Sequence, residues 1–116
     1  MRLFIFLTFT AALFAQAPAS KSAPAPAGDA QNGKKIFASY GCYQCHSYDG
    51  HGGAGARLAP NPPAFAAFIR YVRQPAGEMP PYTAKVVTDK ELADIYAFLL
   101  TIPAPPPAKD IPLLNR

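Results

Sequence analysis

The sequence predicts an all-α domain of three to four helices, and three observations support this prediction. Apolar residues recur at helical spacing in three separate segments of the chain. Prolines and glycines stand at the limits of these segments, where helices begin or stop. No stretch shows the alternation of apolar and polar residues that marks a half-buried strand. With 116 residues, of which half are hydrophobic, the chain has room for one compact domain.

Capping and stop signals limit the three helices. The first helix begins with an aspartate that can cap it, the second begins with a proline pair, and the third begins with a capping box. A glycine or a proline marks the end of each helix. The expected limits are Asp29 and Gly41, Pro62 and Pro75, and Thr88 and Pro103. The side chains expected to face the core are Ile36, Phe37 and Tyr40, then Phe65, Phe68, Ile69 and Val72, and finally Leu92, Ile95, Tyr96, Leu99 and Leu100.

The N-terminal segment has the pattern of an export signal. Met1 and Arg2 are followed by an uncharged, apolar run that ends at Ala15. This run is shorter than the about 20 residues that span a bilayer, so we interpret residues 1–15 as a signal peptide cleaved after Ala15. An uncleaved anchor is the alternative. The signal predicts a periplasmic or secreted protein without a membrane span in the mature chain.

Two proline-rich segments flank the expected domain. Residues 16–28 are mostly alanine, serine and proline without a period, which predicts a flexible linker. Residues 103–116 contain five prolines and predict an extended C-terminal tail. The domain is therefore expected at residues 29–102. A core of that size yields little stability unless another group holds the chain together.

The segment GCYQCHS carries the most specific motif in the chain. It contains the only two cysteines, Cys42 and Cys45, and His46 follows directly. A disulfide between these cysteines would close too short a loop to stabilise the domain. The pattern CxxCH is the attachment sequence for haem c, in which both sulfurs bond to the haem and the histidine ligates the iron. One helical turn would bring the two sulfurs to the same side.

Two other uses of a CxxC pair fit this sequence less well. A thioredoxin-like redox pair would lie among alternating strands and helices, which are not indicated here. A zinc site would need a second pair of cysteines. We therefore expect one covalently attached haem c, with its iron, as the cofactor. The haem would also supply the apolar contacts that the short chain lacks.

Met79 is the candidate for the second axial ligand of the iron. It is the only methionine outside the signal peptide, and Pro80 and Pro81 would stiffen its loop. A thioether is a known axial ligand of haem iron, whereas the usual role of a lone methionine is to fill a gap in a core. His51 is the rival ligand. Its glycine-rich loop lies close to His46, so we interpret it as a solvated loop histidine.

The order of these features resembles that of a class I c-type cytochrome. An opening helix, CxxCH, a glycine-rich loop, a middle helix, a methionine loop and a closing helix follow one another in residues 29–102. The resemblance implies the cytochrome c fold, with three to four helices wrapped around one covalently attached haem. It also implies that Gly33 and Phe37 pack across the closing helix. Ile95 and Phe98 are their expected partners there.

The sequence departs from the family pattern beside the proximal ligand. Such proteins usually have a proline whose carbonyl accepts the proton of the haem-ligating histidine, and this chain has Ala56 at that place. Its backbone carbonyl is still available, so we expect a hydrogen bond from His46 to Ala56. Arg57 is a candidate for contact with a haem propionate, and an ordinary solvated charge is the alternative.

These features predict an electron carrier and not an enzyme. An iron with both axial positions filled, by His46 and Met79, changes oxidation state with little rearrangement and offers no open position to a substrate. A periplasmic monomer that shuttles single electrons between redox proteins is the expected function. The alternative is a cytochrome c subunit of a periplasmic or membrane-associated dehydrogenase or oxidase complex. A haem-based ligand binder or peroxidase would require Met79 to leave the iron.

The net charge of +4 is too modest to indicate a nucleic-acid partner. A basic rim around the haem edge could meet an acidic redox partner. An ordinary solvated surface accounts for the same residues equally well. The residues concerned are Lys34, Lys35, Arg57, Arg70, Arg73, Lys85 and Lys90.

Overall fold

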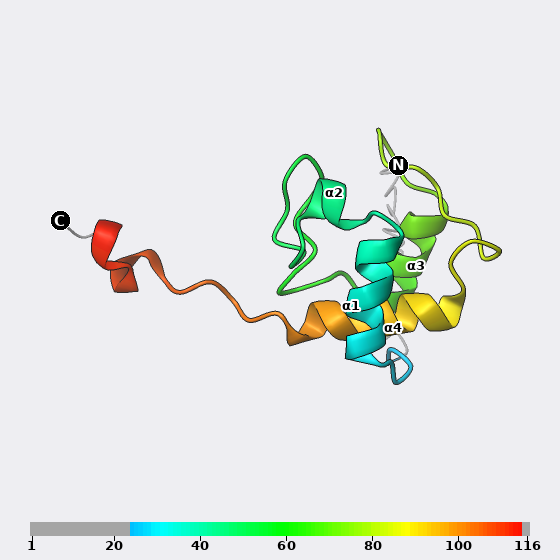
Figure 1. The fold of residues 1–116 in the computed structure, drawn as a ribbon, viewed down its shortest axis with the longest axis horizontal. Coiled ribbons are helices and arrows are strands. Elements are labelled where there is room, and N and C mark those ends of the chain that lie inside the picture. The colour runs from blue at the N-terminus through cyan, green and yellow to red at the C-terminus, as the bar shows by residue number, and fades with distance from the viewer. Residues whose placement is uncertain (1–23, 115–116) are drawn as a thin grey trace, which may run out of the picture.

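A computed structural model describes residues 24–114 (Figure 1). In this part of the chain there are four α-helices and two short 3-10 turns: α1 (Ala30–Ser39), α2 (Tyr43–His46), α3 (Phe65–Arg73), α4 (Asp89–Thr101), η1 (Ala108–Asp110) and η2 (Pro112–Leu114). No strand occurs among the described residues, so the all-α prediction is confirmed. The signal peptide predicted for residues 1–15 lies outside them.

Helix α1 begins where the sequence predicts. The side chain of Asp29 accepts hydrogen bonds from the backbone N–H groups of Gln31 and Asn32, at 2.9 and 3.1 Å, and therefore caps the helix. The last helical residue is Ser39. Gly41 follows with a φ of 78°, in the left-handed region that favours glycine. The chain then turns directly into the short helix α2.

Helix α3 begins later than predicted. Residues 62–64 are not helical, and Ala64 forms the cap with extended backbone and no side-chain hydrogen bond. The physical reason is that a proline disfavours helical geometry in the residue before it, so Pro63 keeps Pro62 extended. The predicted face is confirmed. Phe68 and Val72 are buried, and the half-buried Phe65 and Ile69 pack against the same core.

Helix α4 begins with the predicted capping box. Thr88 Oγ1 accepts a hydrogen bond from the N–H of Glu91 at 3.2 Å, and the Glu91 carboxylate accepts one from the N–H of Thr88 at 2.7 Å. Two backbone donors that have no partner within the helix are satisfied in this way.

The core face of α4 differs from the prediction at one residue. The four other predicted positions are buried, but Leu100 is 56% exposed. Successive residues turn by about 100° around a helix, so Leu100 lies about 140° from Ile95. Phe98, which is 5% exposed, continues the buried face and packs on Phe37 with 5.7 Å between the ring centroids.

Helices α1 and α4 cross in direct backbone contact (Figure 1). A Cβ atom added at Gly33 would lie 1.9 Å from the carbonyl oxygen of Asp94, and one at Gly28 would lie 2.2 Å from the carbonyl oxygen of Ala93. The predicted packing of Gly33 against the closing helix is therefore confirmed. Contacts with α4 already begin at Gly28, the last residue of the predicted linker.

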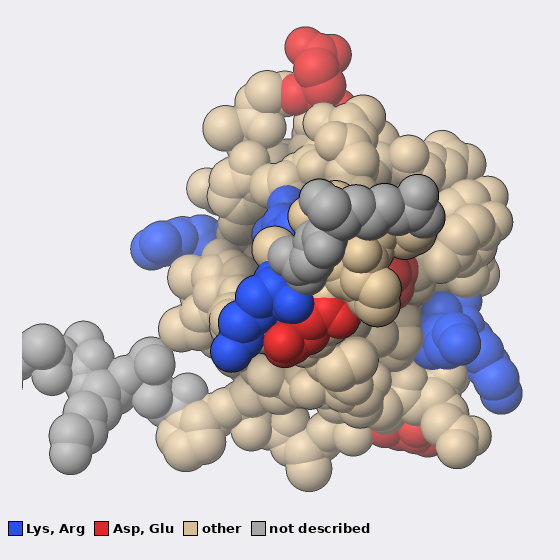
Figure 2. Space-filling model, turned by 90° about the vertical axis from the view of Figure 1, so that its left-hand side faces the viewer, with Lys and Arg blue, Asp and Glu red and all other residues tan. Residues whose placement is uncertain are grey.

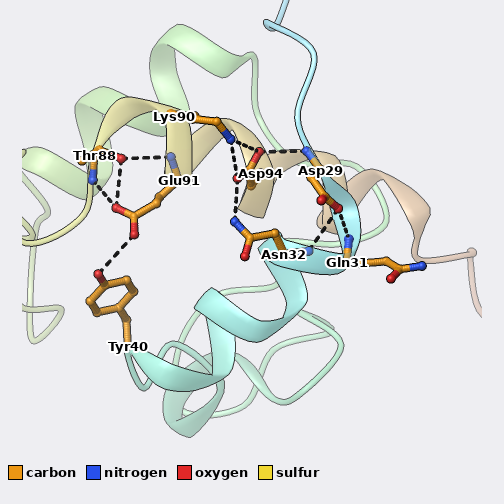
Figure 3. Close-up of polar contacts among 8 residues, drawn as sticks. All are labelled: Asp29, Gln31, Asn32, Tyr40, Thr88, Lys90, Glu91 and Asp94. Atoms are coloured by element: carbon orange, nitrogen blue, oxygen red, sulfur yellow. Dashed lines mark hydrogen bonds and ion pairs between the residues drawn. The ribbon is translucent and has the colours of Figure 1, made fainter.

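Asp94, which is only 1% exposed, ties the beginning of α1 to α4 (Figure 3). Its carboxylate accepts hydrogen bonds from the N–H of Asp29 and from Asn32 Nδ2, both at 2.8 Å, and Lys90 Nζ lies 3.1 Å away. The bond from the Asp29 backbone, followed by that from Asn32, holds the pKa of Asp94 below its ordinary value. No motif in the sequence marks Asp94, although a carboxylate among the buried apolar residues of a helix needs hydrogen-bond or charge partners.

Replacing Asp94 by alanine is expected to lower the free energy of unfolding by about 1–3 kcal/mol, because two partly buried donors lose a charged acceptor. The pKa of Asp94 is lower in the folded state than in the unfolded state. Its contribution is therefore present above the ordinary carboxyl range and is lost as the pH falls through the lowered pKa. Denaturant unfolding at neutral and acidic pH measures this contribution. The free energies of unfolding of the wild type and of Asp94→Ala should become more similar as the pH is lowered. A difference between them that did not change with pH would contradict the prediction.

The tail leaves the domain after α4. Residues 103–107 are exposed and extended, and Figure 1 shows them leading away from the helices to η1 and η2. Leu113 and Leu114 are exposed at the end of this segment. Within residues 24–114, no helix is both long enough and apolar enough to cross a membrane.

Candidate haem-binding site

A large cavity lies between the helices and the loops that join them. Its volume of about 820 Å³ is in the range of small-molecule and cofactor sites. All four helices, the loop after α2 and the loop before α4 contribute to its walls. The lining includes Phe37, Cys42, Cys45, His46, Gly55, Ala56, Leu58, Phe68, Tyr71, Val72, Glu78, Met79, Tyr82, Leu92 and Ile95.

Cys42 and Cys45 both line this cavity, and no disulfide joins them. The carbonyl of Cys42 accepts hydrogen bonds from the N–H groups of Cys45 and His46, at 3.3 and 3.1 Å. The predicted helical turn through the motif is therefore confirmed. Burial raises the pKa of the Cys42 thiol, so that thiol is protonated in neutral solution, whereas Cys45 is exposed.

The imidazole of His46 is held in one orientation. It is 8% exposed, and its Nδ1 lies 2.7 Å from the carbonyl oxygen of Ala56. A carbonyl oxygen can only accept a hydrogen bond, so Nδ1 carries a proton, and in the neutral ring Nε2 has the free lone pair. The hydrogen bond expected from the sequence is confirmed, with alanine in place of the usual proline. It leaves Nε2 available as a metal ligand.

Gly55 brings the loop after α2 close to this imidazole. A Cβ atom at Gly55 would lie 2.8 Å from Cε1 and 3.0 Å from Nδ1 of His46. The N–H of Gly55 also donates to the carbonyl of Cys45 at 2.8 Å. The loop therefore packs tightly on the histidine ring, and only glycine leaves room for that approach.

Met79 reaches the same cavity from the loop between α3 and α4. Its side chain is half-buried and packs against the hydrophobic core. Tyr82 of this loop also lines the cavity, and burial raises the pKa of its hydroxyl. The hydroxyl therefore stays protonated and can donate a hydrogen bond. No motif in the sequence marks Tyr82, and the sequence points to its neighbour Arg73 only as a member of a possible basic rim.

Two residues weighed in the sequence lie elsewhere. Arg57 is exposed and is not part of the cavity lining. His51 is not part of it either, and its Nδ1 pairs with Asp49 at 2.8 Å, which holds the pKa of Asp49 below its ordinary value. The structure thus brings together Cys42, Cys45, His46 and Met79, and leaves Arg57 outside.

The basic residues of the predicted rim do not line the cavity. Arg73 pairs with Asp89 and Lys90 pairs with Asp94, while the other five are exposed. On the face drawn in Figure 2, lysine and arginine side chains are seen at both sides and near the centre, with uncharged and acidic surface between the two sides.

The residues that line the cavity fit a haem. Among the described residues, no group of three His, Cys, Asp or Glu could hold a bare metal ion. The lining is mostly apolar, and in the described part of the chain Glu78 is its only acidic residue, with no lysine or arginine beside it. Apolar walls suit the faces of a porphyrin. Two thiols suit covalent attachment, and an imidazole and a thioether suit the axial positions of iron.

Comparison with known proteins supports this interpretation. Residues 28–99 match the family described as cytochrome c oxidase, cbb3-type, subunit III. Searches of curated proteins and of solved structures found no match. The matched segment contains the CxxCH motif, the methionine loop and α4 as far as Leu99, and cytochrome c domains bind haem c covalently and transfer electrons. Because the match covers more than half of the sequence, the chain belongs to this family, and its domain is a class I c-type cytochrome.

Proposed function

We propose that this protein is a mono-haem electron carrier, with the haem attached to Cys42 and Cys45 and the iron ligated by His46 and Met79. The observation that supports this most is that these four side chains line one apolar cavity. When bound, the haem supplies reversible one-electron chemistry at its iron. The protein's part is to attach it, to fix the axial ligands and to exclude water.

The two proposed axial ligands have different effects on the iron. The hydrogen bond from His46 Nδ1 to the Ala56 carbonyl orients the ring and makes Nε2 a stronger donor. The thioether of Met79 favours the ferrous form, so the reduction potential should lie above that of an iron with two histidines. An apolar lining with Glu78 as its only acidic group among the described residues acts in the same direction, since it stabilises the extra ferric charge poorly.

Electron exchange is proposed to occur at the exposed part of the cavity wall. Cys45, Ala54, Ala56 and Pro63 line the cavity and are exposed to solvent. The side chains of these four residues are small and uncharged, whereas Tyr71 and Glu78, which also line the cavity and are exposed, are large or charged. A redox partner could therefore approach the haem edge most closely at the four small residues. The signal peptide expected at residues 1–15 directs this exchange to the periplasm or the exterior.

Carbon monoxide binding tests the proposed ligation. The reduced wild type should not bind carbon monoxide, because Met79 occupies the sixth position, whereas Met79→Ala should bind it readily. His51→Ala is the matched control, since it removes the rival ligand and should leave the spectra unchanged. Visible spectra of the exported ferric and reduced proteins, with and without carbon monoxide, provide the measurement. Ready binding by the wild type would mean an open iron, suited to ligand sensing or peroxide chemistry.

A subunit role in a dehydrogenase or oxidase complex is the second candidate. The family description, which names an oxidase subunit, favours it. The exposed Leu113 and Leu114 at the end of the tail offer a docking element for such a complex. Purification of the tagged full chain distinguishes the two roles. A stoichiometric partner that is lost when both leucines are replaced by serine supports the subunit, and elution as a monomer supports the carrier.

A further inference from the structure

The loop that carries Met79 is held at one residue, Tyr82, by three hydrogen bonds to three different groups. The N–H of Tyr82 donates to the carbonyl of Val72 at 3.0 Å. Its carbonyl accepts from Arg73 Nη1 at 2.8 Å. Its hydroxyl donates to the carbonyl of Tyr40 at 2.9 Å. The backbone and the side chain of Tyr82 are therefore both fixed, the backbone by α3 and the side chain by the end of α1.

Arg73 connects this point to a third helix. Its Nη2 pairs with Asp89 in the first turn of α4, while its Nη1 binds the Tyr82 carbonyl. The planar guanidinium can make both contacts at once, which the single ammonium of a lysine cannot do in the same geometry. The side chain of Arg73 is mostly buried, so its bond to the Tyr82 carbonyl is little weakened by water, whereas its pair with the exposed Asp89 is screened by solvent.

Tyr40, whose carbonyl accepts the bond from Tyr82, is in turn hydrogen-bonded to α4. The hydroxyl of Tyr40 donates to Glu91 Oε1 at 3.3 Å, and Glu91 belongs to the capping box of α4 (Figure 3). Tyr40 lies two residues before Cys42, at the entrance to the CxxCH motif. The hydroxyl of Tyr82 therefore connects the methionine loop directly to the segment that carries the other proposed haem contacts.

Little freedom remains between Tyr82 and the sulfur ligand. Pro80 and Pro81 are the only residues between Met79 and Tyr82, and each proline ring fixes its own φ angle. With two of the intervening φ angles fixed, a displacement of Tyr82 is largely passed on to the backbone of Met79. The position of Tyr82 therefore limits the positions that the Met79 backbone can take.

We propose that Tyr82 and Arg73 are positioning residues that hold Met79 at the iron. This inference rests on the proposed function, because it takes Met79 to be the sixth ligand. The two residues set how often the loop opens and how easily an external ligand replaces the thioether. They act through the backbone of the loop and need no contact with the haem.

Imidazole titration of the ferric holoprotein measures this opening, because imidazole binds only after Met79 has left. Tyr82→Phe removes one hydroxyl and keeps the ring, and we expect its imidazole affinity to rise about three- to tenfold. Arg73→Gln should produce a rise at least as large. Arg70→Gln removes the same charge from an exposed position on the same helix and should match the wild type. Loss of the methionine–ferric charge-transfer band should follow the same order.

The same titrations in a Met79→Ala background separate positioning from general weakening of the domain. Without a thioether to displace, Tyr82→Phe and Arg73→Gln should have no further effect on imidazole affinity. An equally large effect in that background would overturn the proposal, as would wild-type behaviour of both variants while Met79→Ala alone binds imidazole tightly. If Met79→Ala itself changed neither the affinity nor the band, the ligation by Met79 would be the part that fails.

Discussion

Replacing both Cys42 and Cys45 by alanine is expected to leave the domain unfolded under conditions in which the wild type is folded. Without covalent attachment the haem is lost, and the cavity of about 820 Å³ has nothing to fill it. Its apolar walls would then face water, and the contacts that these walls make with the haem in the holoprotein would be lost. The net stability of a whole domain is only about 5–15 kcal/mol, so the loss of this much buried apolar surface is expected to unfold it.

Far-ultraviolet circular dichroism and thermal melting of the exported variants test this expectation. The single variants Cys42→Ala and Cys45→Ala serve as controls, because each keeps one bond to the haem and should remain helical with a lower melting temperature. A double variant that kept the helical signal and melted cooperatively near the wild-type temperature would show that the polypeptide core is sufficient without the haem.

Gly33→Ala is expected to destabilise the domain by about 3 kcal/mol or more, in the upper range for overpacking. The added Cβ would meet the backbone carbonyl of Asp94 at 1.9 Å, and a backbone atom cannot move away unless α1 and α4 separate. The direction of the change in stability distinguishes a close contact between the helices from an ordinary helical position. At an exposed helical position the same change from glycine to alanine stabilises by about 1 kcal/mol.

Denaturant unfolding of the holoprotein measures the effect of Gly33→Ala. Ala38→Gly, at an exposed position of the same helix, is the matched control and should cost only the about 1 kcal/mol of helix propensity. A neutral or stabilising Gly33→Ala would mean that the two helices do not approach each other as closely as the structure shows.

The elements of the fold followed largely from local signals in the sequence. The caps at Asp29 and Thr88 are predictable because a short polar side chain directly before a helical pattern usually accepts hydrogen bonds from the N–H groups of the first turn. The beginning of α3 differs from the prediction because a proline pair also occurs in the first turn of helices, whereas here Pro63 disfavours helical geometry at Pro62. Leu100 was misassigned because the position of α1, which the sequence does not give, decides which side of α4 is buried.

The site was predictable where a motif marks it. CxxCH singles out Cys42, Cys45 and His46, and Met79 is the only methionine outside the expected signal peptide. The structure places all four at one cavity. Tyr82 could not be found in this way, because its three hydrogen bonds join segments that are far apart in the sequence. A tyrosine in a loop gives no indication of which backbone carbonyl it will meet.

The crossing of α1 on α4 has a consequence for how the protein is assembled. A chain that emerges from its N-terminus presents Cys42 and Cys45 well before residues 89–101, on which α1 must rest, are available. Contacts so distant in the sequence form late. During that interval both thiols are accessible, whereas in the finished domain Cys42 is partly enclosed. A chain that emerges in this order therefore leaves the CxxCH segment open for haem attachment, and the packing of α1 on α4 would then enclose the haem proposed to be bonded there.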